Sequence, residues 1–293
     1  NARGVIPRLS PCHIGSGGIL GGTAVTLACG EADLIVGIGC KFSSFLPVNK
    51  PPAYPVPAGQ RIVQVDIDAE SLGRNVPLAL GLVGDARETL RQLARALSGR
   101  PLSMRPDWLP RLRAERAAYL RRVEELADAR TTAGTDKLNE AAFARAIARL
   151  LPPDAIVCHD GGQIMEWTHT FIDPDDPRNN LFVPGMGHLG FGLPMANAAK
   201  LVHPDRTVVC VNGDGAMGMT SQELETAARY GLNVIVICGN DSHWGMYRPL
   251  GEQVYQNQQF GTRLTDVNFA RVAEGYGCHG EKLASIDELP AAF

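Results

Sequence analysis

Along the chain, short runs of apolar residues alternate with longer stretches in which apolar residues recur at helical spacing. Residues 207–211 and 234–238 are short, β-branched runs, and each ends in glycine and acidic or amide residues. Between them Leu224, Ala227 and Ala228 recur at helical spacing before Gly231. This pattern predicts two buried parallel strands joined by a helix.

The same alternation extends over the whole chain. Strands are predicted at 32–39, 61–68, 81–85, 155–158 and 181–183, and helices at 86–97, 108–127 and 138–150. We therefore expect an α/β fold with two doubly wound parallel-sheet domains. The predicted organisation is a first domain at 1–98, an Arg-rich helical linker at 99–134 and a second domain at 135–293. The proline-rich stretch 47–57 is expected to be an irregular loop.

Composition narrows the class of protein. The chain has 293 residues, is 45% hydrophobic and carries a net charge of −3, so neither a nucleic-acid-binding nor a membrane-binding surface is indicated. Its seven cysteines are scattered and form no C-x-x-C pair. They are typical of reduced, buried residues, which favours a cytoplasmic protein.

Two carboxylates are predicted at one edge of the second sheet. Asp214 follows the first of its two central strands and Asp241 follows the second, and right-handed βαβ units bring such strand ends together. Gly213 and Gly215 allow backbone N–H groups to approach an anion. Two carboxylates beside an anion site favour a divalent cation, and Mg²⁺ holding a diphosphate fits this pattern.

These residues carry a family resemblance. Gly-Asp-Gly at 213–215, 24 intervening residues and then Asn240-Asp241 resemble the fingerprint of thiamine-diphosphate (ThDP) enzymes. The following His243-Trp244-Gly245-Met246 resembles the corresponding motif of acetolactate synthases. The resemblance implies that Asp214, Asp241 and the main-chain carbonyl of His243 bind Mg²⁺. The family more often has Asn where this chain has Asp241.

The resemblance also implies the residues that contact the cofactor. A Gly-Gln pair that contacts the diphosphate matches Gln163, although Ile164 stands where the family often has His. Leu189 matches the apolar residue that bends the cofactor between its two rings. His188 either faces substrate or forms part of the cleft wall. The complete implied cofactor set is Gln163, Gly187, His188, Leu189, Asp214, Gly215, Ala216, Asp241, His243, Trp244, Gly245 and Met246.

A dinucleotide site is an alternative interpretation. Residues 185–190 match G-x-G-x-x-G, and Asp214 ends the next strand. That pattern leaves Asp241 and the turn at Gly215 unexplained, and a tight turn in an ordinary α/β domain would also satisfy it.

The first domain resembles the central domain of the same family, which carries FAD in some members. Residues 41–45, Lys-Phe-Ser-Ser-Phe, lack the arginines of the FAD-binding members, so FAD is possible but disfavoured.

The implied activity is a ThDP- and Mg²⁺-dependent carboligase that acts on 2-oxo acids, as acetolactate synthases do. The alternatives are a lyase or decarboxylase resembling benzoylformate decarboxylase, sulfoacetaldehyde acetyltransferase or 2-hydroxyacyl-CoA lyase, and a catalytically degenerate homologue. The resemblance further implies a homodimer or homotetramer with its active site at the subunit interface. The activating glutamate belongs to an N-terminal pyrimidine-binding domain that does not precede Asn1, so we expect a partial chain with no catalytic residue assigned.

Overall fold

The structure is a computed structural model that divides into two compact units. One unit combines Asn1–His13 with Arg122–Phe293, and the other is Ile14–Arg121. The domain boundaries drawn from the sequence stay a prediction. The structure describes residues 2–18, 21–43, 46, 48, 57–101, 105–129, 138–183, 187–248, 251, 254, 256 and 260–293. The loop expected at 47–57 lies outside the described residues except for Val48 and Pro57.

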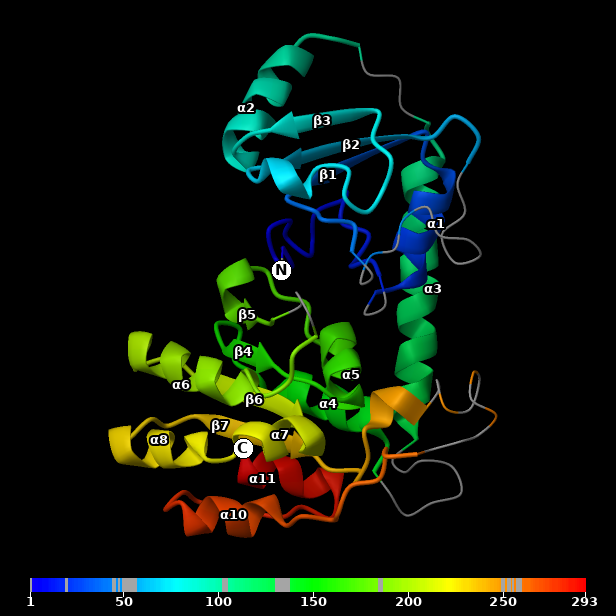
Figure 1. Ribbon diagram of the computed structural model, residues 1–293. Coiled ribbons are helices and arrows are strands. Elements are labelled where there is room, and N and C mark those ends of the chain that lie inside the picture. Colours follow the sequence, from blue (N-terminus) through cyan, green and yellow to red (C-terminus); the bar gives the residue numbers. More distant parts are fainter. Residues whose placement is uncertain are drawn as a thin grey trace. The chain divides into compact units, whose positions relative to one another are not determined.

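The unit Ile14–Arg121 is built on a parallel sheet of order β1-β2-β3 (Figure 1). In its register Leu34 pairs with Arg61, and Val63 pairs with Leu80. The core of this unit contains Phe42, Ile62 and Val76. The elements are α1 (Thr23–Glu31), β1 (Leu34–Ile38), β2 (Arg61–Asp66), η1 (Ala69–Ser71), β3 (Leu80–Val83), α2 (Ala86–Leu97) and the first part of α3 (Trp108–Asp128).

Helix α2 has the bounds predicted from its periodicity, and its N-cap Asp85 accepts a hydrogen bond from the Glu88 N–H at 3.0 Å. Its apolar residues share one face, yet Leu90, Leu93 and Leu97 are 47%, 43% and 40% exposed. The apolar stripe of this helix is therefore partly exposed in the described structure. Sequence periodicity fixes which residues share a face, but it does not determine what covers that face.

The second unit contains a four-stranded parallel sheet of order β5-β4-β6-β7. The strands are β4 (Ile156–His159), β5 (Asn180–Leu181), β6 (Val208–Gly213) and β7 (Ile235–Gly239). The chain leaves β4 to form β5 on one side and then returns past β4 to form β6 on the other side. This reversal makes the space beyond the carboxyl ends of β4 and β6 the expected ligand crevice.

Helices cover both faces of this sheet. Ile156 and Cys158 pack in a cluster with residues of α6, α7, α8 and α10, whereas Val157 packs in a second cluster with residues of α4, α5 and α11. The alternation follows from the two-residue period of a strand. Parallel sheets with flanking helices are confirmed. The helices are α4 (Glu140–Leu150), α5 (Gln163–Phe171), η2 (Pro177–Asn179), α6 (Gly192–Val202), α7 (Asp214–Thr220), α8 (Glu223–Tyr230), η3 (Gly245–Tyr247), α10 (Phe269–Gly275), η4 (Ile286–Glu288) and α11 (Leu289–Ala292).

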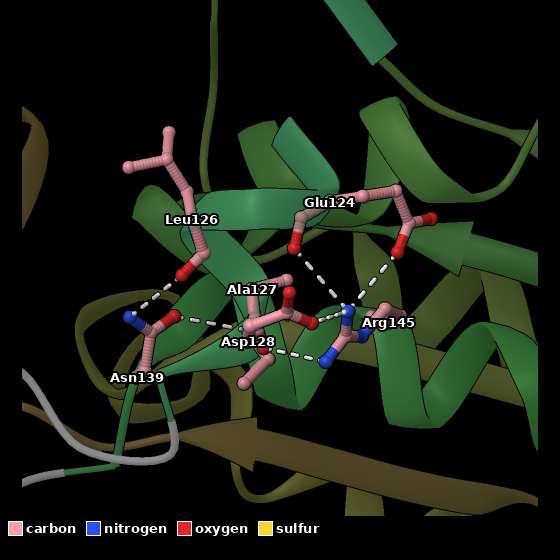
Figure 2. Close-up of polar contacts among 7 residues, drawn as sticks. Glu124, Leu126, Ala127, Asp128, Asn139 and Arg145 are labelled. Carbon is pink, nitrogen blue, oxygen red and sulfur yellow. Dashed lines mark hydrogen bonds and ion pairs between the residues drawn. The ribbon is translucent and has the colours of Figure 1, made fainter. Parts of the chain in front are cut away.

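The end of α3 is fastened to α4 by two side chains (Figure 2). Arg145 donates to the Ala127 carbonyl at 2.6 Å and pairs with Asp128 at 2.8 Å and Glu124 at 3.0 Å. Asn139 donates to the Leu126 carbonyl at 3.3 Å. Its side-chain oxygen also accepts the Ala142 N–H at 3.0 Å and so caps the start of α4. Arginine at a helix C-terminus satisfies carbonyls that lack helical partners.

The N-terminal segment packs on the second unit. The guanidinium of Arg3 donates to the carbonyls of His169 at 2.5 Å and Ile172 at 2.9 Å, and the Arg8 N–H donates to Asp175 at 3.0 Å. From the sequence, these residues are expected in the first domain, 1–98, and that boundary stays a prediction. A buried guanidinium on carbonyls more than 160 residues away is a tertiary contact that no local pattern encodes.

Two general expectations can be compared with the structure. All seven cysteines are free, and Cys158 and Cys210 are buried as expected, but Cys12 is exposed. Among the described helices, none combines the length and the apolarity that crossing a membrane requires.

Candidate functional site

Asp214 lies where β6 ends and α7 begins. Gly213 is the N-cap of α7, and Asp214 is its first residue. The side chain is 6% exposed, and its Oδ1 accepts the Gly215 N–H at 2.9 Å. Its Oδ2 is buried and makes no hydrogen bond within the described part of the chain. Burying a carboxylate oxygen without a hydrogen-bond partner costs free energy of folding unless a ligand binds to it.

Asp241 lies at the end of the neighbouring strand β7. Its Oδ1 accepts the His243 N–H at 3.0 Å, and its Oδ2 is 2.8 Å from a guanidinium nitrogen of Arg248. Between the two predicted ligands, Ser242 has φ +59°, a left-handed conformation that is uncommon for serine. The chain therefore turns sharply immediately after Asp241.

The predicted third ligand is the carbonyl of His243. His243 pairs with Arg263 in an antiparallel bridge. The hydrogen bonds of this bridge come from its neighbours, Trp244 N–H to Thr262 O and Leu264 N–H to Ser242 O, both 2.8 Å. In such a pair the groups of the central residue point away from the partner strand. The His243 carbonyl is thus directed away from Arg263.

Carboxylates are concentrated around this edge. Burial raises the pKa of Asp214, the Gly215 N–H lowers it, and the nearby Asp241 carboxylate raises it. Burial, reinforced by Asp241, also raises the pKa of Glu140 at the start of α4 to about 7. The pKa of Glu166 on α5 is raised by burial. Carboxylates that lie close together repel one another, so a cation at this edge is favoured.

The end of β4 meets the same edge. Gly161 O accepts the Gly213 N–H at 2.7 Å, and a Cβ on Gly162 would lie 3.1 Å from the Gly213 Cα. Gln163 follows as the first residue of α5. A Cβ on Gly245 would lie 2.9 Å from the Gln163 Oε1 and 3.3 Å from the Asp241 Oδ2. The structure therefore brings Gln163, Asp241 and Gly245 together.

The loop before α6 contributes Leu189. Its Cδ2 is 1.8 Å from the position that a Cβ on Gly161 would take, so Leu189 fits there only because residue 161 is glycine. Gly187 and His188 are exposed, and the His188 ring packs edge-on against Phe191 at 4.9 Å. The first two residues of the G-x-G-x-x-G pattern, 185 and 186, lie outside the described residues.

Trp244 covers the glycine turn at the start of α7. A Cβ on Gly215 would lie 2.4 Å from Cζ3 of the indole ring, so glycine is required for this approach. Ala216 is buried behind the turn, and Gly245 and Met246 form part of η3. The segments 213–216 and 241–246 are thus in contact, as a shared site requires.

The residues present fit a divalent cation that carries a phosphate. The unpartnered Oδ2 of Asp214, the carboxylate of Asp241 and the outward-turned His243 carbonyl supply oxygen ligands, which Mg²⁺ prefers. The Arg248 guanidinium already provides a positive charge at Asp241. Among the described residues, no three or more His, Cys, Asp and Glu side chains form a metal-holding group. The set proposed here instead uses one main-chain oxygen.

Sequence reasoning missed three charged residues at or beside the site. Asp160 directly follows β4, so the rule that identified Asp214 could have found it. Glu140 has the pattern of an ordinary acidic residue in a first helical turn. Arg248 comes seven residues after Asp241 with no periodic signal, and only its ion pair reveals its place.

The fold and the site define an α/β protein with an acidic, glycine-lined edge at the switch point of a parallel sheet. Residues 160–293 match the family described as "Thiamine pyrophosphate enzyme, C-terminal TPP binding domain". Residues 1–93 match "Thiamine pyrophosphate enzyme, central domain". The chain belongs to the thiamine pyrophosphate enzymes.

Several curated relatives align along nearly the whole chain. The acetolactate synthase large subunit of Haemophilus influenzae is 32% identical over 290 residues, covering 98% of this chain and 49% of the relative. Isozyme 3 of the large subunit from Escherichia coli is 30% identical over 291 residues, with 98% and 49% covered. A probable large subunit from Methanocaldococcus jannaschii is 29% identical over 299 residues, with 98% and 48% covered. The chain spans about half the length of these relatives.

Proposed function

We propose that the full-length protein is a ThDP- and Mg²⁺-dependent carboligase that acts on 2-oxo acids and resembles acetolactate synthase. The observation that carries the proposal is the pair of carboxylates at the ends of β6 and β7, one with a buried oxygen that lacks a partner within the described residues. The family match and the names of the relatives support the same activity.

In this proposal Asp214, Asp241 and the His243 carbonyl hold Mg²⁺, and Gln163 contacts the diphosphate. Leu189 supports the cofactor between its rings, with Gly187 and His188 on the same loop. The turn at Gly215 and Ala216 and the segment Trp244, Gly245 and Met246 line the remaining wall. When bound, ThDP supplies the carbon nucleophile that makes decarboxylation of a 2-oxo acid possible. The protein supplies binding, orientation and a partly buried, water-poor edge.

Arg248 balances the negative charge of Asp241 in the proposed site. Asp241 introduces a negative charge that an asparagine would not, next to a proposed diphosphate. Arg248 lies 2.8 Å from that carboxylate and offsets the added charge. Asp214 and Asp241 can therefore both offer oxygen ligands without leaving uncompensated negative charge near the phosphates.

The assembly and location are also proposals. A homodimer or homotetramer with the active site at the subunit interface would complete the cofactor pocket. The free cysteines favour a reducing compartment, and we propose the cytoplasm. An absorption spectrum of the purified protein would show whether it carries FAD.

Activity is tested by supplying the full-length protein with pyruvate, ThDP and Mg²⁺ and measuring CO₂ and acetolactate. We expect both products, and loss of both in Asp214→Ala. Glyoxylate, sulfoacetaldehyde and acyl-CoA thioesters are then screened as further substrates. CO₂ release without a carboligation product from any acceptor would instead favour a decarboxylase. No turnover despite cofactor binding would favour a degenerate homologue.

A further inference from the structure

Asp160 is a buried carboxylate beside the proposed site that contacts neither the proposed metal ligands nor Gln163 among the described hydrogen bonds. It follows β4 and is 3% exposed. Its Oδ1 accepts the Gly161 N–H at 2.7 Å, and its Oδ2 accepts the N–H groups of Gly190 at 3.0 Å and Gly192 at 2.7 Å. The Gly190 N–H also lies 3.2 Å from Oδ1. One side chain therefore binds two loops about 30 residues apart.

The Asp160 carboxylate also caps the N-terminus of α6. The N-cap residue of α6 is Phe191, which provides no side-chain cap. The first N–H groups of a helix lack helical partners and attract negative charge. Asp160 thus acts as a cap supplied from a different strand. A Cβ on Gly192 would lie 2.6 Å from the Asp160 Cβ, and Gly190 has φ +91°, so the loop is shaped closely around this side chain.

Leu189 lies between the two anchored points. It precedes Gly190, whose N–H is held by Asp160, and its side chain rests on Gly161, whose N–H is held by the same carboxylate. The distance between Leu189 and the end of β4 is therefore set by Asp160. Hydrogen bonds from several N–H groups to one buried carboxylate are short, directional and costly to lose.

We propose that Asp160 is a positioning residue that holds Leu189 where its side chain can support the cofactor between its two rings. The inference rests on the proposed function, because the position of Leu189 matters to binding only if ThDP occupies this edge. It goes further by separating two tasks at the site. The segments that contain Asp214 and Asp241 anchor the diphosphate. The hydrogen bonds of Asp160 hold the loop whose Leu189 supports the organic part of the cofactor.

The test compares two probes in the full-length protein with Mg²⁺ present: ThDP and inorganic pyrophosphate. Asp160→Asn keeps the side-chain shape but replaces one acceptor oxygen with an NH₂ group that faces backbone N–H donors. We expect the Kd for ThDP to rise about tenfold or more, whereas the Kd for pyrophosphate changes less than about twofold. Calorimetry provides both constants.

Asn197→Ala is the matched control. Asn197 is a buried polar residue on the same helix α6, and its amide donates to the Glu223 carbonyl at 2.9 Å, away from the loop. Its replacement should leave the ratio of the two Kd values unchanged even if the protein loses stability. An equal shift for both probes in Asp160→Asn, or no shift in either, would overturn the positioning role.

A second variant keeps the proposal testable if Asp160→Asn does not fold. Gly190→Ala strains the same loop at φ +91° while Asp160 is retained, and it should produce the same selective loss of ThDP binding. Unchanged ThDP binding in Gly190→Ala would contradict the proposal. A wild-type protein that binds neither probe with Mg²⁺ would instead contradict the proposed function itself, so the two failures are distinguishable.

Discussion

The guanidinium of Arg248 lies 2.8 Å from Oδ2 of Asp241, the carboxylate proposed to bind the metal. Neither side chain is deeply buried, with 39% and 21% of their surfaces exposed. A positive charge at this distance competes with a second cation for the same oxygen. In the proposed site, Arg248 therefore lowers the metal affinity of the edge while it balances the charge of Asp241.

Removing this charge should strengthen metal binding. In Arg248→Gln the concentration of Mg²⁺ that gives half-saturation at a fixed ThDP concentration should fall several-fold, as expected for loss of roughly 1 kcal/mol of charge repulsion. Arg271→Gln, an exposed arginine on α10, is the control and should leave it unchanged. Weaker Mg²⁺ binding in Arg248→Gln alone would show that the arginine supports the metal rather than competing with it.

The contact between Gly215 and Trp244 gives a prediction about packing. Gly215→Ala places a methyl group 2.4 Å from the indole ring, so Trp244 must move. We expect a loss of about 1–3 kcal/mol in the free energy of unfolding, which is typical of overpacking. Tryptophan fluorescence should shift, and the affinity for ThDP should fall.

Gly218→Ala is the matched control on the same helix. Nothing lies within 4 Å of a Cβ at this exposed position of α7. Because alanine is a better helix former than glycine, this change should stabilise the protein by about 0.5–1 kcal/mol without shifting the fluorescence. Similar losses of stability in both variants would mean that the Trp244 contact is not the cause.

Glu140 should make stability depend on pH. Burial raises its pKa from the ordinary 4.5 to about 7 in the folded protein. The folded state therefore holds the proton more tightly than the unfolded state. The resulting stability is fully present below pH 4.5 and is lost as the pH rises through about 7.

Glu140→Gln removes this dependence. Relative to wild type, the variant should gain stability between pH 4.5 and about 7 and keep a constant advantage above that range. The advantage should be on the order of 3 kcal/mol. Urea unfolding at several pH values measures it, with the exposed Glu274→Gln as control. A Glu140→Gln difference that is the same at every pH would contradict the assigned cause.

The fold follows closely from the sequence where local chemistry decides it. The strand predicted at 234–238 is observed as β7, Ile235–Gly239, and the helix at 86–97 has the same bounds as α2. The strand predicted at 207–211 is observed as β6, Val208–Gly213, and it passes directly into α7 at Asp214. Glycine permits that passage, but only packing against Gly161 and Trp244 determines it.

The sequence predicts candidate ligands only where they follow strands. Asp214 and Asp241 meet at one edge because parallel βαβ units place strand ends together. The position of Asp160 after a strand could have been predicted, but its hydrogen bonds to Gly190 and Gly192 could not. The ion pair of Arg248 with Asp241 likewise has no signal in a linear pattern. The pairing of the buried rings of His159 and His169, 4.2 Å apart, is another contact of this kind.

Calorimetric titration of ThDP into the full-length protein, with Mg²⁺ or with a chelator, tests the metal-bridged diphosphate site most directly. The account predicts saturable binding that requires Mg²⁺ and is abolished by Asp214→Ala. The account would be contradicted by ThDP binding that does not depend on Mg²⁺, by ThDP binding retained in Asp214→Ala, or by binding of NAD⁺ in place of ThDP.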